Sequence, residues 1–232
     1  MASYTEVSIC EMALYRIGIA EQFTDVDGTI AGVTDSTVEQ RVCARVYAQA
    51  RDRVLQSHHW TFARKFVTLV LADDGTGEIW TDEWENAYTY PSDCLKIRRF
   101  VTDVGKGWYH TSGEFSDLRF GGSTHNEWPY VVRQHAGAKV ILTDVETADA
   151  DIEYTCQETD TTLYDDLFVS ALAYLIAAEI TVPLVGEGAD AKRREMLTLY
   201  GWEMQQARSL SVNEERPHDE GDGDFVRARG WH

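Results

Sequence analysis

The chain has 232 residues, of which 44% are hydrophobic and 11% aromatic, and this composition is typical of a globular protein. The length allows one large hydrophobic core or two smaller ones. The formal net charge of −18 argues against a protein that holds nucleic acid by general attraction to phosphates, because like charges repel.

The N-terminal segment predicts a short first helix. Ser3 and Glu6 have the spacing of a capping box, so we expect the helix to begin there, to continue to about Ile17 and to end at Gly18. A loop over residues 21–34 follows. The apolar residues that mark the buried face of the helix are Ile9, Met12, Ala13 and Ile17.

A second capping-box pattern, Ser36 with Glu39, predicts a long helix that ends near His58. Its small apolar residues recur at every fourth position, which indicates one buried helix face. The predicted core stripe is Val38, Val42, Val46, Ala50 and Val54.

Between residues 61 and 160 the sequence predicts a β region. Short runs rich in Val, Ile, Tyr, Phe and Thr alternate with Gly, Asp, Asn and Ser, at a spacing of about 10 residues. Such a spacing is typical of an antiparallel sandwich or a small barrel. The predicted strands are Phe62–Leu71, Ala87–Tyr90, Leu95–Val101, Gly107–Thr111, Asp117–Phe120, Tyr130–Gln134, Lys139–Thr143 and Asp151–Cys156.

Helical patterns return after the β region. Thr161 and Thr162 are predicted to cap a helix of Leu163–Val182, which ends before Pro183 because the residue before a proline disfavours helical geometry. A last helix is predicted over Ala189–Leu210. Its expected core stripe is Met196, Leu199, Tyr200, Met204 and Ala207.

These elements predict an α+β fold with three parts. Residues 1–60 and 161–212 are expected to form a four-helix bundle from the N- and C-terminal segments. Residues 61–160 are expected to form the inserted antiparallel β-sandwich or barrel, and residues 213–232 an extended C-terminal arm.

Neither a signal peptide nor a membrane span is expected. The N-terminus carries Glu6 and Glu11 and lacks a basic start. The most apolar run, Leu167–Ile180, has about 14 residues, fewer than the roughly 20 that a bilayer requires, so we interpret it as a buried helix.

The four cysteines, Cys10, Cys43, Cys94 and Cys156, are widely separated, and none belongs to a CxxC or Cys/His cluster. We expect reduced and mostly buried thiols of a cytosolic product, with one disulfide pair as the alternative.

No catalytic, cofactor-binding or metal-binding residue is predicted. Counted from Asp25, a glycine stands at the fourth position and Ser36 at the twelfth, whereas an EF-hand requires glycine at the sixth and glutamate at the twelfth. His58 and His59 are interpreted as a helix-terminal pair favoured by the helix dipole. The sequence has no HExxH motif, nucleophile elbow or phosphate loop. We therefore do not expect an enzyme.

The C-terminal arm combines acidic residues with a final aromatic and basic stretch. Such a composition cannot fold alone, but it is typical of an anchor that becomes ordered on a partner. A frayed terminus without function is the alternative. The predicted partner-binding residues are Phe225, Val226, Arg227, Arg229 and Trp231.

A set of short motifs in the first 100 residues resembles a known family. They are Cys10–Leu14, Arg16–Gly18, Tyr47, Arg51-Asp52, Leu55, His59-Trp60, Phe62-Ala63, Ala87-Tyr88, Tyr90-Pro91 and Asp93–Leu95. In this order and spacing they resemble the head-to-tail adaptor family of tailed phages, similar to tail tubular protein A. The resemblance extends loosely to the two C-terminal helices.

The resemblance implies a structural virion protein of the neck and tail, assembled in the host cytoplasm. Members form a homo-oligomeric ring, commonly dodecameric, beneath the portal protein, and they carry the tail nozzle or tube protein. Viral DNA is expected to pass through the ring without tight binding. By position, residues 213–232 correspond to the portal-binding arm.

Two other functions stay open. A tail-associated peptidoglycan hydrolase would need a carboxylate pair about 5 to 9.5 Å apart in a cleft. A carbohydrate-binding module would need an exposed aromatic platform, for which the candidate residues are Trp60, Trp80, Trp84, Trp108 and Trp128.

Overall fold

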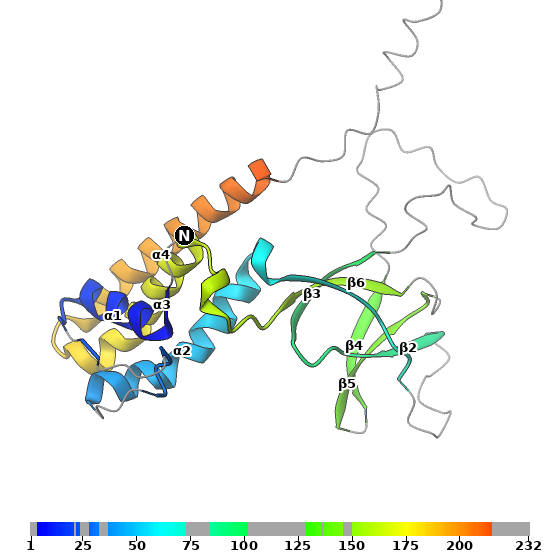
Figure 1. The fold of residues 1–232 in the computed structure, drawn as a ribbon, viewed down its shortest axis with the longest axis horizontal. Coiled ribbons are helices and arrows are strands. Elements are labelled where there is room, and N and C mark those ends of the chain that lie inside the picture. Colours follow the sequence, from blue (N-terminus) through cyan, green and yellow to red (C-terminus); the bar gives the residue numbers. More distant parts are fainter. Residues whose placement is uncertain are drawn as a thin grey trace, which may run out of the picture. The chain divides into compact units, whose positions relative to one another are not determined.

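The computed structural model of the chain describes residues 4–20, 22–23, 28–32, 37–72, 84–101, 129–135, 137–145 and 150–214. In these residues it contains four α-helices and two three-stranded antiparallel sheets, which confirms the α+β class (Figure 1). The predicted strands Gly107–Thr111 and Asp117–Phe120 lie outside the described residues.

The chain divides into two compact units. The helical unit consists of Met1–His58 and Thr159–His232, and the β unit consists of His59–Glu158. The sequence placed the two boundaries after residues 60 and 160.

Helix α1, Glu6–Ile17, begins later than predicted. Its N-cap is Thr5, whose hydroxyl accepts a hydrogen bond from the Ser8 amide at 3.1 Å, while the Ser8 hydroxyl accepts one from the Thr5 amide at 2.9 Å. Thr5 and Ser8 thus form the capping box, and the prediction of Ser3 with Glu6 was wrong. Gly18 ends the helix as predicted, with a φ of +92° that favours glycine.

Helix α2, Val38–Ser57, is capped by Thr37 and not by Ser36. Its predicted core stripe was wrong in its first half, where Val38 is 52% exposed. A strict four-residue spacing drifts by about 40° per step, because a helix has 3.6 residues per turn. The helix buries instead a face with alternating spacings: Gln40, Cys43, Tyr47, Ala50, Arg51, Val54 and Leu55.

Helix α3, Asp166–Val185, begins at the N-cap Asp165, and the predicted caps form a short 3₁₀ turn, Thr161–Leu163. The helix also continues through Pro183, where it was predicted to end. Pro183 lies in the last turn. A proline at that place removes one hydrogen bond near the end of the helix and interrupts no further turns, so it is tolerated.

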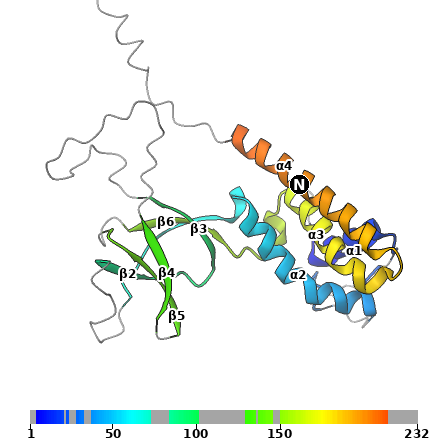
Figure 2. The same ribbon diagram turned by 180° about the vertical axis from the view of Figure 1, so that it is seen from behind.

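Helix α3 forms the centre of the helical unit and packs against α1, α2 and α4 (Figure 2). It is long and apolar enough to cross a membrane, but 61% of its apolar window is buried inside the protein. A core helix has the same composition, and the burial identifies α3 as one. Its largest fully buried side chains are Phe168, Leu172, Leu175, Ile176 and Ile180.

Helix α4, Ala189–Glu214, runs beside α3 and is longer than the predicted Ala189–Leu210. Met196, Met204 and Ala207 of its predicted stripe are buried, whereas Leu199 and Tyr200 are only half-buried.

The β unit contains two sheets. In the first the order is β1 (Arg64–Thr68), β6 (Asp151–Cys156) and β3 (Cys94–Val101). In the second the order is β2 (Asn86–Thr89), β5 (Ala138–Thr143) and β4 (Tyr130–His135).

One segment connects the two sheets and explains why β1 is shorter than the predicted Phe62–Leu71. After β1, the Leu69 amide donates to the Ala150 carbonyl at 2.7 Å. Leu71 then bridges Tyr88 of β2, and the Ala72 amide donates to the Ala87 carbonyl at 2.9 Å. The chain therefore leaves the first sheet after β1 and pairs with the second.

Candidate functional site

The predicted partner-binding residues lie outside the described residues, and their role stays a prediction. They are Phe225, Val226, Arg227, Arg229 and Trp231. Two other places bring polar and charged side chains together: a groove along α1 in the helical unit and a charge cluster around Glu153 in the β unit.

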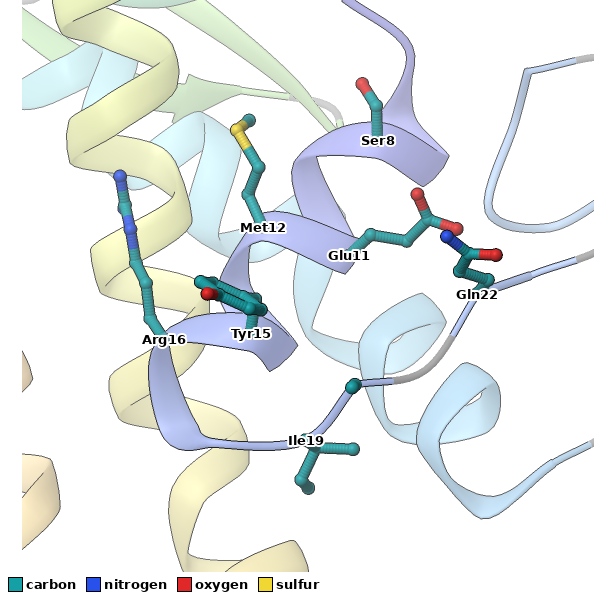
Figure 3. Close-up of a pocket in the computed structure, with 8 residues that line it drawn as sticks. Ser8, Glu11, Met12, Tyr15, Arg16, Ile19 and Gln22 are labelled. Atoms are coloured by element: carbon teal, nitrogen blue, oxygen red, sulfur yellow. The ribbon is translucent and has the colours of Figure 1, made fainter.

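The groove along α1 is open to the surface and has a volume of about 770 Å³ (Figure 3). One wall comes from a single face of α1, because residues three or four positions apart lie side by side on a helix. The other wall is the chain segment that follows the helix. The lining residues are Ser8, Glu11, Met12, Tyr15, Arg16, Ile19, Ala20 and Gln22.

The turn after α1 builds the second wall. Gly18 takes a left-handed conformation, and the Ile19 amide then donates to the Leu14 carbonyl at 3.0 Å, which directs the chain back along the helix. The Glu11 carboxylate accepts a hydrogen bond from the Phe23 amide at 2.8 Å and so ties the returning segment to α1. In Figure 3 Glu11 and Gln22 point toward each other.

Arg16 joins the groove to the core of the helical unit. Its guanidinium donates to the Ser170 carbonyl at 2.7 Å and lies 3.6 Å from the ring centre of Tyr174, both on α3. Burial lowers the pKa of Arg16 below its usual value. The guanidinium is thus held by α3 rather than directed at a ligand.

The groove combines apolar side chains with charged ones that are already bound within the protein. Both of its charged side chains, Glu11 and Arg16, bind other parts of the protein. Met12 and Ile19 are half-buried, and Tyr15 is 77% exposed. An open surface of this mixed character is typical of protein contacts, whereas small-molecule sites are enclosed.

The second place is a buried carboxylate in the first sheet of the β unit. Glu153, in the central strand β6, is 1% exposed and lies opposite Arg99 of β3, whose guanidinium donates to it. Its other oxygen lies 3.2 Å from Arg64 Nε and 3.4 Å from His59 Nε2. The two arginine charges offset the cost of burying this acid, and His59 lies on the third side.

Next to Glu153 on β6, Thr155 is fully buried, and its hydroxyl accepts a hydrogen bond from Arg98 Nε at 2.8 Å. Burial lowers the pKa of Arg98, and the nearby Glu153 acts in the opposite direction. The polar face of this sheet is therefore closed by arginine side chains, which join β1 and β3 to β6.

The sequence did not indicate this cluster. His59 was interpreted as one of a helix-terminal pair without a carboxylate nearby, but its partner Glu153 is far away in the chain. The alternation of polar and apolar residues in β6 was the available indication of a polar face, and it is commonly the mark of a face turned to solvent.

Among the residues that the structure describes, no three His, Cys, Asp or Glu side chains are grouped to hold a metal ion. Of the tryptophans considered for a carbohydrate platform, Trp60 is buried and Trp84 packs against the core of the second sheet, while Trp80, Trp108 and Trp128 lie outside the described residues. Comparison with known proteins finds no family model and no curated protein that matches this sequence.

Proposed function

We propose that this chain is a structural, non-enzymatic virion protein, a phage head-to-tail adaptor. It assembles as a ring beneath the portal protein, joins the head to the tail nozzle or tube, and surrounds the channel through which viral DNA leaves. The proposal rests on the resemblance of the first 100 residues to this family, and the surface of the helical unit supports it.

The structural observation that supports the proposal is the exposure of large side chains on the helical unit. Tyr15 beside the groove is 77% exposed, and Trp202 on α4 is 63% exposed. Leu210, further along α4, is 49% exposed. Exposed Tyr and Trp residues are enriched at protein interfaces, so these positions on α1 and α4 are suited to contacts between subunits.

The proposal includes a finer arrangement of the fold. The four helices act as one bundle that forms the contacts around the ring, and the two sheets form a sandwich or barrel that meets neighbouring components. The residues that follow α4, 215–232, form the portal-binding arm, with Phe225 and Trp231 as anchors. The first two residues of the predicted arm belong to α4.

The charge of the chain fits a channel through which DNA slides. Each copy has a formal net charge of −18, so a ring of copies surrounds the duplex with negative charge. Repulsion between the wall and the phosphates opposes adhesion, and the attraction that retains DNA-binding proteins is missing.

The direct test mixes the purified full chain with its portal protein and images the particles. We expect rings of the chain bound to one end of the portal. A chain that stays unbound, or virions that retain DNA and acquire tails without it, would contradict the proposal. Clearing of a peptidoglycan zymogram by the chain would favour the hydrolase instead.

The arm is tested by two matched double variants. Phe225→Ala with Trp231→Ala removes the apolar anchors, whereas Arg227→Ala with Arg229→Ala removes charge from the same stretch. We expect the aromatic variant to weaken portal binding at every salt concentration and the arginine variant to weaken it mainly at low salt. Equal portal binding by both variants and the unchanged chain would disprove the arm, while ring formation would still test the rest.

A further inference from the structure

The cysteines of the protein form two pairs, although they are far apart in the sequence. Cys10 of α1 and Cys43 of α2 share a thiol hydrogen bond. This bond and the burial of Cys10 both raise the pKa of Cys10. Cys94 begins β3 and lies directly opposite Cys156, the last residue of β6. All four are free thiols and all four are buried.

The register of β3 and β6 places Cys94 and Cys156 where a cross-strand disulfide can form. The Gln157 amide donates to the Asp93 carbonyl at 2.7 Å, while the Cys94 amide donates to Pro91 at 3.1 Å instead of to Cys156. These bonds make the two cysteines a non-hydrogen-bonded pair, in which the Cα atoms are about 4.5 Å apart. Disulfides span Cα separations of about 4.4 to 6.8 Å, a range that includes this typical value. The register of β3 shifts between Cys94 and Lys96, so the pair lies at the end of the ladder beside an irregular position.

The two pairs differ in how an oxidant reaches them. Cys94 is 8% exposed and Cys156 is fully buried, but both stand at strand ends, where local opening is frequent. Cys10 and Cys43 lie inside helices and are both fully buried. Burial raises the pKa values of Cys94 and Cys156, so their oxidation depends on this opening.

We infer that Cys94 and Cys156 form a site of reversible oxidation, which closes to a disulfide when the protein meets a small disulfide oxidant such as oxidised glutathione. The Cys10–Cys43 pair stays reduced under the same conditions. This inference does not depend on the proposed function, because it rests on the register of β3 and β6.

The reaction balances as a thiol–disulfide exchange. The Cys94 thiolate attacks one sulfur of oxidised glutathione, forms a mixed disulfide and releases one glutathione thiolate. The Cys156 thiolate then attacks the Cys94 sulfur and releases the second glutathione. Two protein thiols lose two protons and two electrons, and the oxidant gains both as two glutathione thiols. Cys94 also gives up the hydrogen bond that its thiol donates to Tyr90, at 3.2 Å.

The bond would close a long loop, because the chain between Cys94 and Cys156 includes β4 and β5 of the second sheet. A cross-link of this length stabilises a fold mainly by restricting its unfolded chain. We expect the melting temperature of the β unit to rise by about 10 °C on oxidation and to return after reduction.

The experiment incubates the full chain with mixtures of oxidised and reduced glutathione, blocks free thiols with an alkylating agent in denaturant, and maps the peptides by mass spectrometry. The expected result is one linked peptide pair that contains Cys94 and Cys156, with Cys10 and Cys43 alkylated. A persistent glutathione adduct on Cys94, alkylation of Cys94 and Cys156 in every mixture, or earlier oxidation of Cys10 with Cys43 would overturn the inference.

Two variants matched in burial provide the control for the melting temperature. Cys156→Ala removes one partner of the β pair, and Cys43→Ala removes one partner of the helical pair; both positions are fully buried. Oxidation should raise the melting temperature of Cys43→Ala as it does for the unchanged chain and should leave that of Cys156→Ala unchanged. If Cys156→Ala does not fold, the peptide map of the unchanged chain decides alone, because the linked pair is either present or absent.

Discussion

The two units of the protein are stabilised in different ways. The helical unit is centred on α3, whose buried side chains are almost all apolar. The first sheet of the β unit has one apolar face, with Ile152 and Tyr154, and one polar face that buries Glu153 and Thr155 beneath arginines. The stabilisation from buried apolar surface does not depend on the orientation of the groups, whereas that from buried ion pairs depends on the position of every partner.

This difference has a consequence for mutations. When an apolar core loses one side chain, the cost in the free energy of unfolding grows with the cavity that remains. A buried charge cluster fails as a whole, because the loss of its central acid, which is 1% exposed, breaks the ion pairs of all its partners at once. The two units should therefore respond differently to single substitutions.

The largest effect is expected at Glu153. The change Glu153→Ala leaves Arg99, Arg64 and His59 without the acid that they surround, so we expect a loss of about 3 to 5 kcal/mol in the free energy of unfolding. Denaturant unfolding measures the loss. Hydrogen exchange should locate it, with faster exchange in β6 and unchanged exchange in α3.

The control for this change is Glu85→Ala in the same unit, where the side chain is exposed and the cost should stay below about 0.5 kcal/mol. If Glu153→Ala costs no more than Glu85→Ala, the cluster does not stabilise the sheet. Equal exchange in α3 and β6 would show instead that the units do not differ.

A smaller and more graded effect is expected in α3. Leu172 is fully buried, and Leu172→Ala should cost about 3 kcal/mol through lost burial and a residual cavity. Leu172→Met keeps most of the volume and should cost less than about 1.5 kcal/mol. Leu210→Ala, at a position 49% exposed, is the control on α4 and should cost less than either. Thermal and denaturant unfolding measure these costs. If Leu172→Met costs as much as Leu172→Ala, the volume of the side chain does not determine the stability of this core.

The sequence predicted the helices and strands because their signals are local. Capping residues, apolar spacing and Gly18 fix where α1 and α2 lie to within a few residues. The choice between Ser3 and Thr5, or between Ser36 and Thr37, could not be made, because each candidate residue has a hydroxyl that can cap. Pro183 was misjudged because the rule against proline in helices weakens in the last turn.

The sites could not be predicted in the same way, because they depend on residues far apart in the chain. The pairing of His59 with Glu153 and of Cys94 with Cys156 follows from the order of strands in the first sheet, which places β6 between β1 and β3. The six predicted strands that fall in the described residues are present, with bounds that differ by a few residues, but their spacing alone does not give their order. The groove was also unpredicted, since it depends on the turn after Gly18 and on Glu11 binding the Phe23 amide.

The smallest effect concerns the edge of the same sheet and should depend on pH. The Asp93 carboxylate lies 2.8 Å from Lys65 Nζ and accepts a hydrogen bond from the Tyr154 hydroxyl at 3.0 Å. Burial acts to raise the pKa of Asp93, but the hydrogen bonds from Lys65 and Tyr154 together lower it below the usual value. A pKa that is lower in the folded state stabilises the fold above the unfolded pKa of about 4, and this contribution is lost as the pH falls through the folded pKa.

We therefore expect Asp93→Asn to cost less than about 1 kcal/mol at neutral pH, because both partners are partly exposed and the pair is screened by solvent. The difference between the variant and the unchanged chain should shrink as the pH falls below about 4, where the carboxylate of the unchanged chain takes up its proton. Urea unfolding across that pH range measures it. Glu187→Gln, at an exposed position of the helical unit, controls for the loss of one negative charge from a chain of net charge −18. If the cost of Asp93→Asn is constant with pH, or equals that of Glu187→Gln at each pH, the edge of the β unit does not depend on this ion pair. The contrast between the units would then rest on Glu153 alone.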